Sequence, residues 1–145
     1  MNEKIVMYEE NGICMKKRLL YLLFPVIALI LEILPFGAVC NFAVSPERTQ
    51  RKTFSYFSLV PYGYANFTPF ITALITCVVI VLLLVYCFRC KHSIAKASKV
   101  LTGVGAVASF GQFFLGLNYI SIVSVLISLA LVAEFILLHL KLKVD

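Results

Sequence analysis

Four long stretches of apolar residues alternate with short polar segments along the chain. They cover residues 19–40, 67–88, 98–117 and 120–140. Since a transmembrane helix needs about 20 mostly apolar residues, each stretch is long enough to cross a bilayer. The last two stretches lie within one apolar run, which as a single helix would be about 60 Å long, roughly twice the hydrocarbon thickness. That run must fold back, and Gly116–Ser121 is the natural turn, because Gly and Asn tolerate turn geometry and Ser121 can cap the next helix.

The pattern predicts an all-α membrane protein, a four-transmembrane-helix bundle. Residues 1–18 form an N-terminal cytoplasmic segment, residues 19–140 the transmembrane domain and residues 141–145 a cytoplasmic tail. An outer loop, residues 41–66, connects the first two helices. Pro46–Lys52 is a polar turn in this loop, and the strand-forming residues on both sides of it, Phe42–Val44 and Thr53–Leu59, indicate a short β-hairpin over the bundle.

Composition agrees with a lipid environment. Apolar residues make up 61% of the chain and charged residues 14%, with a mean hydropathy of +0.97. Soluble domains have about 45–50% apolar and about 25% charged residues, so a core of this size cannot hide so much apolar surface from water. The net charge of +6 does not indicate nucleic-acid binding, because the basic residues lie at the edges of the apolar runs. In that position they act as topology signals.

Charge placement orients the bundle in the plasma membrane. Only Arg48, Arg51 and Lys52 lie on the side of the outer loop. The other side, which holds both termini, collects ten of the thirteen basic residues: Lys4, Lys16, Lys17, Arg18, Arg89, Lys91, Lys96, Lys99, Lys141 and Lys143. The positive-inside rule makes this side cytoplasmic.

The first helix has a competing interpretation. Met15–Arg18 followed by an apolar run is also typical of a secretory signal peptide, and Gly37–Cys40 is similar to a lipoprotein cleavage box. The run is long, however, and is interrupted by Glu32 and Pro35. We therefore favour a first helix that is retained.

Two acidic residues, Glu32 and Glu134, lie inside the apolar stretches. Ionisable groups in a membrane are costly and normally face the protein interior. We estimate depth by counting residues from the basic residues at the cytoplasmic end of each helix. This places one polar residue of each helix about 20 Å from the cytoplasmic edge of the membrane. This predicts a polar layer of Glu32, Thr76, Gln112 and Ser128. Glu134 lies about 10 Å closer to the cytoplasm, so the two acids should not pair.

The third helix presents a stripe of small and polar residues to its neighbours. It consists of Ser98, Thr102, Gly105, Ser109, Gln112 and Gly116, at steps of three and four residues. We expect Glu32 to face this stripe. Two roles remain open for the acids: a neutral, hydrogen-bonded packing element, or a functional titrating group.

Aromatic residues gather in the second half of the outer loop. They form a candidate contact surface of Phe54, Tyr56, Phe57, Tyr62 and Tyr64. Exposed aromatics can anchor a partner. The alternative, which we favour, is that they lie at the membrane interface or fill the top of the bundle.

Motifs for chemistry are sparse. Cys87 and Cys90 form a single CxxC pattern near His92, which we interpret as small residues ending a helix rather than a metal or redox site. The sequence has no recognisable Ser/His/Asp motif, HExxH or phosphate-binding glycine loop. We therefore expect no enzyme activity, no metal site and no cofactor.

Three stretches resemble small four-span membrane proteins of Gram-positive, Clostridia-like bacteria: Glu32–Val39, Arg51–Leu59 and Tyr62–Ala73. The resemblance implies a bacterial plasma membrane and carries no assigned activity.

The expected function is that of a structural or accessory membrane protein. It would act through helix or outer-loop contacts with a membrane-protein partner or with a second copy in a homo-oligomer, with the lipid bilayer as its surroundings. The alternative is a small proton-coupled or cation transporter subunit in which Glu32 titrates.

Overall fold

The computed structural model describes residues 19–45, 48–63, 66–89 and 92–141. They are mostly helical with one two-stranded sheet, which confirms the helical class and a hairpin in the outer loop. The second strand covers residues 48–54, so it begins inside the predicted polar turn and ends before most of the predicted strand over residues 53–59. In chain order the elements are η1 (Leu20–Leu22), α2 (Leu23–Ile33), β1 (Ala38–Ser45), β2 (Arg48–Phe54), α3 (Leu59–Gly63), α4 (Thr68–Arg89), α5 (His92–Ser109), α6 (Gly111–Phe114), η2 (Leu117–Tyr119) and α7 (Ile122–Lys141).

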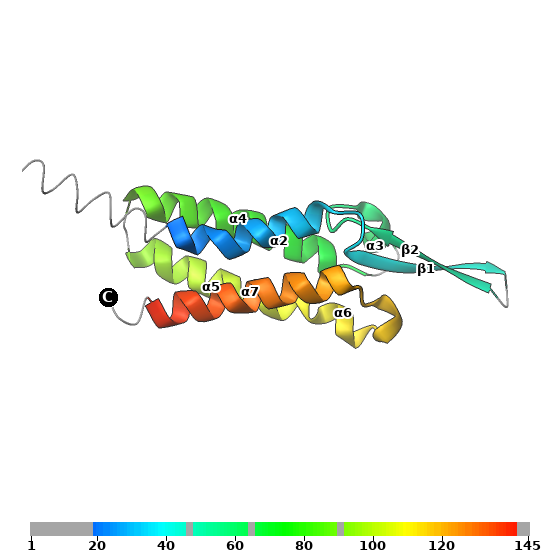
Figure 1. Ribbon diagram of the computed structural model, residues 1–145. Coiled ribbons are helices and arrows are strands. Elements are labelled where there is room, and N and C mark those ends of the chain that lie inside the picture. Colours follow the sequence, from blue (N-terminus) through cyan, green and yellow to red (C-terminus); the bar gives the residue numbers. More distant parts are fainter. Residues whose placement is uncertain (1–18, 46–47, 64–65, 90–91, 142–145) are drawn as a thin grey trace, which may run out of the picture.

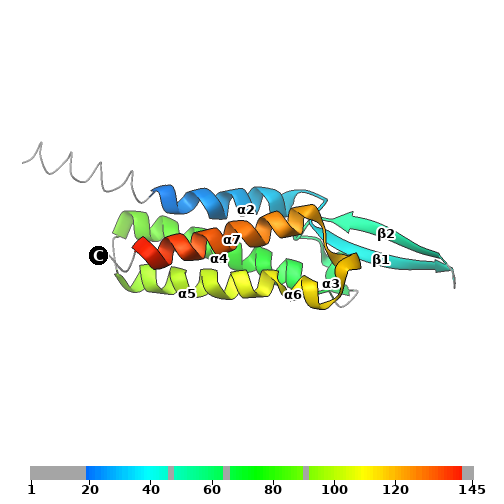
Figure 2. The same cartoon turned by 60° about the horizontal axis from the view of Figure 1, so that its bottom comes forward.

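The long helices α2, α4, α5 and α7 lie side by side, and the hairpin projects from one end of them (Figure 1). Helix α2 packs against α4 and α7, and α5 packs against the same two helices on the other side. Figure 2 shows that the start of α2 and the end of α7 lie at the end opposite the hairpin. The helices therefore enclose a common interior that one end of the hairpin can reach.

In the described part of the chain, two helices are long and apolar enough to cross a membrane: α4, with 22 residues, and Ile122–Leu140 within α7, with 19 residues. At about 1.5 Å per residue, α4 is about 33 Å long, close to the thickness of a bilayer's hydrocarbon core. The apolar helix at residues Leu20–Ile33 is shorter. By length and composition, α4 and α7 support association with a membrane.

The first helix ends at Ile33, so the prediction of a helix over residues 19–40 is wrong beyond that point. Leu34 has a ψ of 141°, which is an extended conformation. The cause is Pro35, whose ring disfavours the helical conformation in the residue before it. The apolar residues from Ala38 onward belong to β1 instead, and the first three of them are buried.

The third predicted helix, residues 98–117, begins earlier and is interrupted. Helix α5 already starts at His92 and stops at Ser109, and α6 follows as a separate short helix. At the break, the Phe110 amide donates to the Val107 carbonyl at 3.1 Å and the Phe113 amide to the Phe110 carbonyl at 3.0 Å. These three-residue steps are tighter than an α-helix and change the direction in which later side chains point.

The predicted turn before the last helix is present. Gly116 has a φ of +108°, a conformation that glycine adopts without strain. The Ser121 hydroxyl then accepts a hydrogen bond from the Ser124 amide at 3.0 Å, which caps the start of α7 as expected.

The hairpin is antiparallel and has two different faces. Asn41 lies opposite Arg51, and Ala43 lies opposite Thr49. Since side chains alternate along a strand, these residues share one face, and Phe42 and Lys52 belong to the other. On that second face the Phe42 ring meets the Phe54 ring at 6.2 Å between centroids, and the Lys52 Nζ lies 5.9 Å from the Phe42 centroid.

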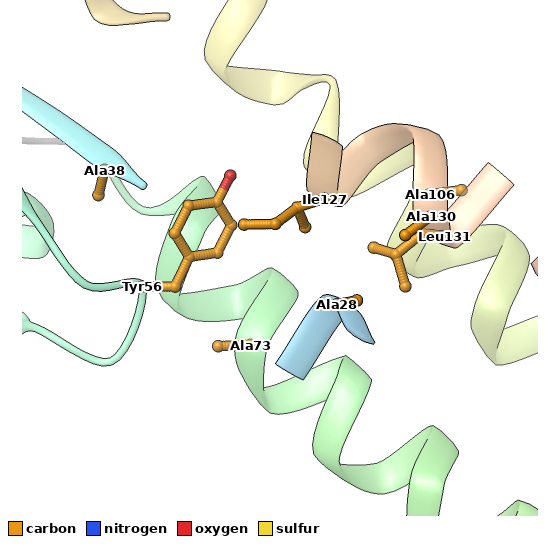
Figure 3. Packing of buried hydrophobic residues seen from close by; sticks show 8 residues of the cluster. All are labelled: Ala28, Ala38, Tyr56, Ala73, Ala106, Ile127, Ala130 and Leu131. Carbon is orange, nitrogen blue, oxygen red and sulfur yellow. The ribbon is translucent and has the colours of Figure 1, made fainter. Parts of the chain in front are cut away.

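Small residues let the helices approach closely at the hairpin end. Ala28 of α2, Ala73 of α4, Ala106 of α5 and Ala130 of α7 belong to one buried cluster with Ile127 and Leu131 (Figure 3). Tyr56, which follows β2, inserts its ring into this cluster. A second cluster, containing Leu83, Tyr86 and Leu138, fills the opposite end. The segment after the hairpin therefore completes the helical core.

Candidate functional site

Glu32 lies in the last turn of α2 and is fully buried. The Thr76 hydroxyl lies 2.8 Å from Glu32 Oε1 and 3.0 Å from the Thr72 carbonyl, and both contacts fit a hydrogen bond. Thr76 has a single hydroxyl proton and can donate to only one of them at a time. A neutral Glu32 that donates to Thr76, while Thr76 donates to Thr72, satisfies both contacts together.

Tyr56 connects Glu32 to Gln112. The backbone amide of Tyr56 donates to the Glu32 carbonyl at 2.9 Å, and Gln112 Nε2 donates to the Tyr56 hydroxyl at 2.5 Å. Both side chains are fully buried. Burial raises the pKa of Tyr56 well above its ordinary value, so its hydroxyl keeps its proton. Gly37 packs on this ring, since a Cβ at Gly37 would lie 2.8 Å from two ring carbons.

The predicted polar layer forms only in part. Glu32 and Thr76 are in contact, whereas Gln112 is joined to them through Tyr56. The Ser128 hydroxyl donates to the Ser124 carbonyl of its own helix, at 3.0 Å. In the same way, the Ser109 hydroxyl donates to the Ala106 carbonyl, at 2.7 Å.

The carboxyl group of Glu32 points into the bundle and bonds to Thr76 of α4, and its link to the stripe of the third helix runs through Tyr56 to Gln112. Residue counting assumes straight, continuous helices, and here α2 stops at Ile33 and the third helix is broken at Phe110. The stripe is nevertheless turned inward. Its members Ser98, Thr102, Ser109 and Gln112 are all fully buried.

Glu134 is also fully buried, in α7, and neither of its carboxyl oxygens has a hydrogen-bond partner among the described residues. The same holds for Glu32 Oε2 and Gln112 Oε1. Buried polar groups are nearly always hydrogen-bonded, so each exception calls for an explanation. Glu134 therefore makes no hydrogen bond to Glu32.

The aromatic residues of the predicted contact surface do not share one exposed patch. Tyr56 is buried, and Phe54 and Phe57 are partly buried against the helical cluster. Tyr62 is 45% exposed and makes edge contacts with Phe67 and Phe70, at 4.9 and 5.9 Å between centroids. Tyr64 lies outside the described residues. Within the described chain, these side chains chiefly close the end of the helical core.

A polar pocket of about 430 Å³ lies between the hairpin and η2. It is lined by Asn41, Thr49, Arg51, Asn118 and Tyr119. The Arg51 guanidinium donates from Nη2 to the Ile120 carbonyl at 2.7 Å, which fixes one end of the side chain. The sequence alone does not reveal this pocket, because η2 and the hairpin are far apart in the chain and meet only in the fold.

The described His, Cys, Asp and Glu side chains do not gather in groups of three or more that could hold a metal ion. Cys90, one half of the CxxC pattern, lies outside the described residues. Cys40 is buried in β1, and this burial raises the pKa of its thiol above the ordinary value. No protein-family model matches the chain, and no curated protein or solved structure matches it either.

Proposed function

We propose that the protein spans the plasma membrane four times, with both termini in the cytoplasm. The support is that all four long helices carry exposed apolar side chains on their outward faces, and not only α4 and α7. Examples are Ile27, Ile30 and Ile33 on α2, Val78 and Val81 on α4, Val104 and Val107 on α5, and Leu129 and Ile136 on α7. Contiguous apolar surface on this scale marks contact with a membrane or a partner.

The charges agree with this orientation. Arg89, Lys96 and Lys99 belong to the end of α4 and the first half of α5, at the end opposite the hairpin. The basic residues of that end would be cytoplasmic by the positive-inside rule, and the hairpin would then stand outside the cell.

Within this topology, the protein is a structural or accessory membrane protein without a catalytic role, and its hairpin docks onto a partner. The observation that carries the proposal is the exposure of β2: six of its seven residues are exposed and the last is partly buried, while the hairpin projects beyond the helices. Among the residues that the structure describes, the sheet has two strands, so no described strand lies beside the outer edge of β2. Such an edge can accept an extended segment by backbone hydrogen bonding.

The charge of the hairpin indicates the kind of segment. The hairpin sequence contains three basic residues, Arg48, Arg51 and Lys52, and one acid, Glu47. Charge complementarity speeds association and excludes like-charged partners. The partner proposed here is therefore an acidic, extended segment of another membrane or envelope protein.

Photo-cross-linking in native membranes tests this role. A photoreactive residue at Gln50, exposed in the middle of β2, should capture one reproducible partner, and one at Val81 on the outward face of α4 should not. The pair Arg48→Glu and Lys52→Glu should reduce the yield severalfold, whereas Arg48→Lys with Lys52→Arg keeps the charge and should retain it. Differently tagged copies of the chain show whether the captured partner is a second copy. If the chain with the photoreactive residue at Gln50 yields only uncross-linked monomer, the proposal is contradicted.

A second candidate function is proton-coupled or cation transport. It is favoured by two fully buried carboxyl groups, Glu32 and Glu134, with three oxygens that lack hydrogen-bond partners in the described chain. Intramembrane acids often mark ion pathways. Purified protein in liposomes should then conduct protons or cations, and Glu32→Gln should abolish the flux. A flux that Glu32→Gln leaves unchanged rules out this role for Glu32.

A further inference from the structure

The polar pocket beside the hairpin is built from three elements. Asn41 comes from β1, Thr49 and Arg51 from β2, and Asn118 and Tyr119 from η2. The hairpin register places Asn41 directly opposite Arg51, with Thr49 two residues further along the same face. Because β1 packs on η2, this face looks onto the turn before α7.

The chemistry of the lining is that of an anion site. A guanidinium, two side-chain amides and two hydroxyl groups can all donate hydrogen bonds, and none of the described residues that line the pocket is acidic. Arg51 donates from Nη2 to the Ile120 carbonyl at 2.7 Å, and a guanidinium has five N–H donors in a fixed fork. The Ile120 contact therefore orients the group and leaves donors for a ligand.

Phosphate fits this donor set best. Arginine recognises phosphate through parallel, charge-assisted hydrogen bonds, and hydroxyl and amide donors can meet the remaining oxygens. The volume of about 430 Å³ is larger than a single phosphate group needs. It leaves room for the organic substituent of a phosphate ester as well.

The position of the pocket suggests where such an ester could come from. The contact of Arg51 with Ile120 lies two residues before α7 begins at Ile122. In the four-span topology this is the outer end of a membrane helix, the depth at which phospholipid headgroups lie.

We propose that this pocket binds a phosphate ester, supplied by a phospholipid headgroup of the outer leaflet or by a soluble phosphate compound. The lipid source rests on the membrane topology proposed above, whereas the recognition of phosphate does not. The pocket is on the face of the hairpin opposite Lys52. Arg51 adds to the charge of the hairpin, but the docking test changes Arg48 and Lys52, which are not among the residues lining the pocket.

The test compares two neighbouring basic side chains, Arg51 and Lys52. The full chain is purified in detergent, and binding of short-chain phosphatidylglycerol, of glycerol phosphate and of inorganic phosphate is measured by titration calorimetry. Arg51→Gln should weaken binding about tenfold or more, because it removes the charge-assisted hydrogen bonds. Lys52→Gln removes the same charge from the next residue, on the opposite face, and should change the affinity less than about twofold.

Arg51→Gln also removes the bond to Ile120, so it could weaken binding by disturbing the fold. A second variant controls for this effect. Asn118→Ala keeps that bond and should still weaken binding severalfold. Binding of the lipid alone identifies a headgroup site, and binding of glycerol phosphate or inorganic phosphate at similar affinity identifies a soluble ligand. Equal losses with Arg51→Gln and Lys52→Gln, or no binding of any of the three probes, overturn the proposal. Because none of these outcomes involves the Gln50 cross-link, failure here is distinguishable from failure of partner docking.

Discussion

Removing the Tyr56 hydroxyl isolates one polar contact in the core. Tyr56→Phe keeps the ring that packs with Ala28 and Ile127, and deletes only the acceptor for Gln112 Nε2, which lies 2.5 Å away. Both side chains are fully buried, so water cannot replace the lost acceptor. Leaving a buried donor without a partner costs about 1–3 kcal/mol. We expect Tyr56→Phe to lower the free energy of unfolding by that amount.

A double-mutant cycle separates this contact from other effects. Gln112→Leu removes the donor as well, so Tyr56→Phe should cost much less in that background, with a coupling energy of about 1–2 kcal/mol. Tyr62→Phe is the matched control, because Tyr62 is 45% exposed. Its loss should stay within about 0.5 kcal/mol, as is usual for surface changes.

The assay is equilibrium unfolding of the full chain in mixed micelles by added dodecyl sulfate, followed by far-ultraviolet circular dichroism. A stabilising hydrogen bond is contradicted if the stability of Tyr56→Phe stays within about 0.3 kcal/mol of that of the parent chain, or if the two changes are additive within about 0.3 kcal/mol. Either outcome would mean that the hydroxyl and the amide do not stabilise each other.

Three further predictions use the same unfolding measurement. Gly111→Ala should destabilise by about 1–3 kcal/mol, because its Cβ would collide with the Thr68 side chain; Gly63→Ala, in open space, is its control, and equal effects would contradict the packing. Ser121→Ala should cost about 1–2 kcal/mol through loss of the α7 cap together with the bond to the Gly37 carbonyl, and an unchanged midpoint would argue against both contacts. Glu134→Leu should raise stability by about 1–3 kcal/mol, because it removes a buried carboxyl group without partners; a loss of stability would instead reveal a contact that this carboxyl makes.

The elements that sequence could predict are those in which one local signal dominates. The apolar run that became α4 begins beside Pro69 and ends at Arg89, and the last helix is preceded by Gly116 and capped by Ser121. Apolar length, a turn residue and a cap all point to the same structure in these places. A helix boundary can be predicted from sequence where several local signals agree in this way.

The end of the first helix and the make-up of the polar core could not be read in the same way. Apolar residues continue past Ile33 through Cys40, and hydropathy does not distinguish a buried strand from a helix. Pro35 is the residue that ends the helix, but the apolar residues on both sides of it favour a continuous span by hydropathy. Tyr56 enters the core from a segment outside the predicted helices, so counting residues along helices could not place it between Glu32 and Gln112.

The contacts at the base of the hairpin bear on how it could act. The Tyr56 amide donates to the Glu32 carbonyl at 2.9 Å, which ties the segment after β2 to α2. The Ser121 hydroxyl donates to the Gly37 carbonyl at 2.7 Å, which ties the segment before β1 to the start of α7. Arg51 adds a third connection, from within β2 to the Ile120 carbonyl.

Three hydrogen bonds from different parts of the hairpin region hold it to the helices, so its direction is set by the helical body. A partner that pairs with β2 then has less conformational entropy to overcome than it would with a loose loop, because the strand is already extended and placed. Cutting one connection should therefore weaken docking without touching the docking surface. Ser121→Ala is suited to this test, since it removes the bond to Gly37 far from Gln50. Reduced cross-linking at Gln50 in this variant, with helical content unchanged, would tie the binding role of the hairpin to its rigid base, and an unchanged yield would show that the base is not needed for docking.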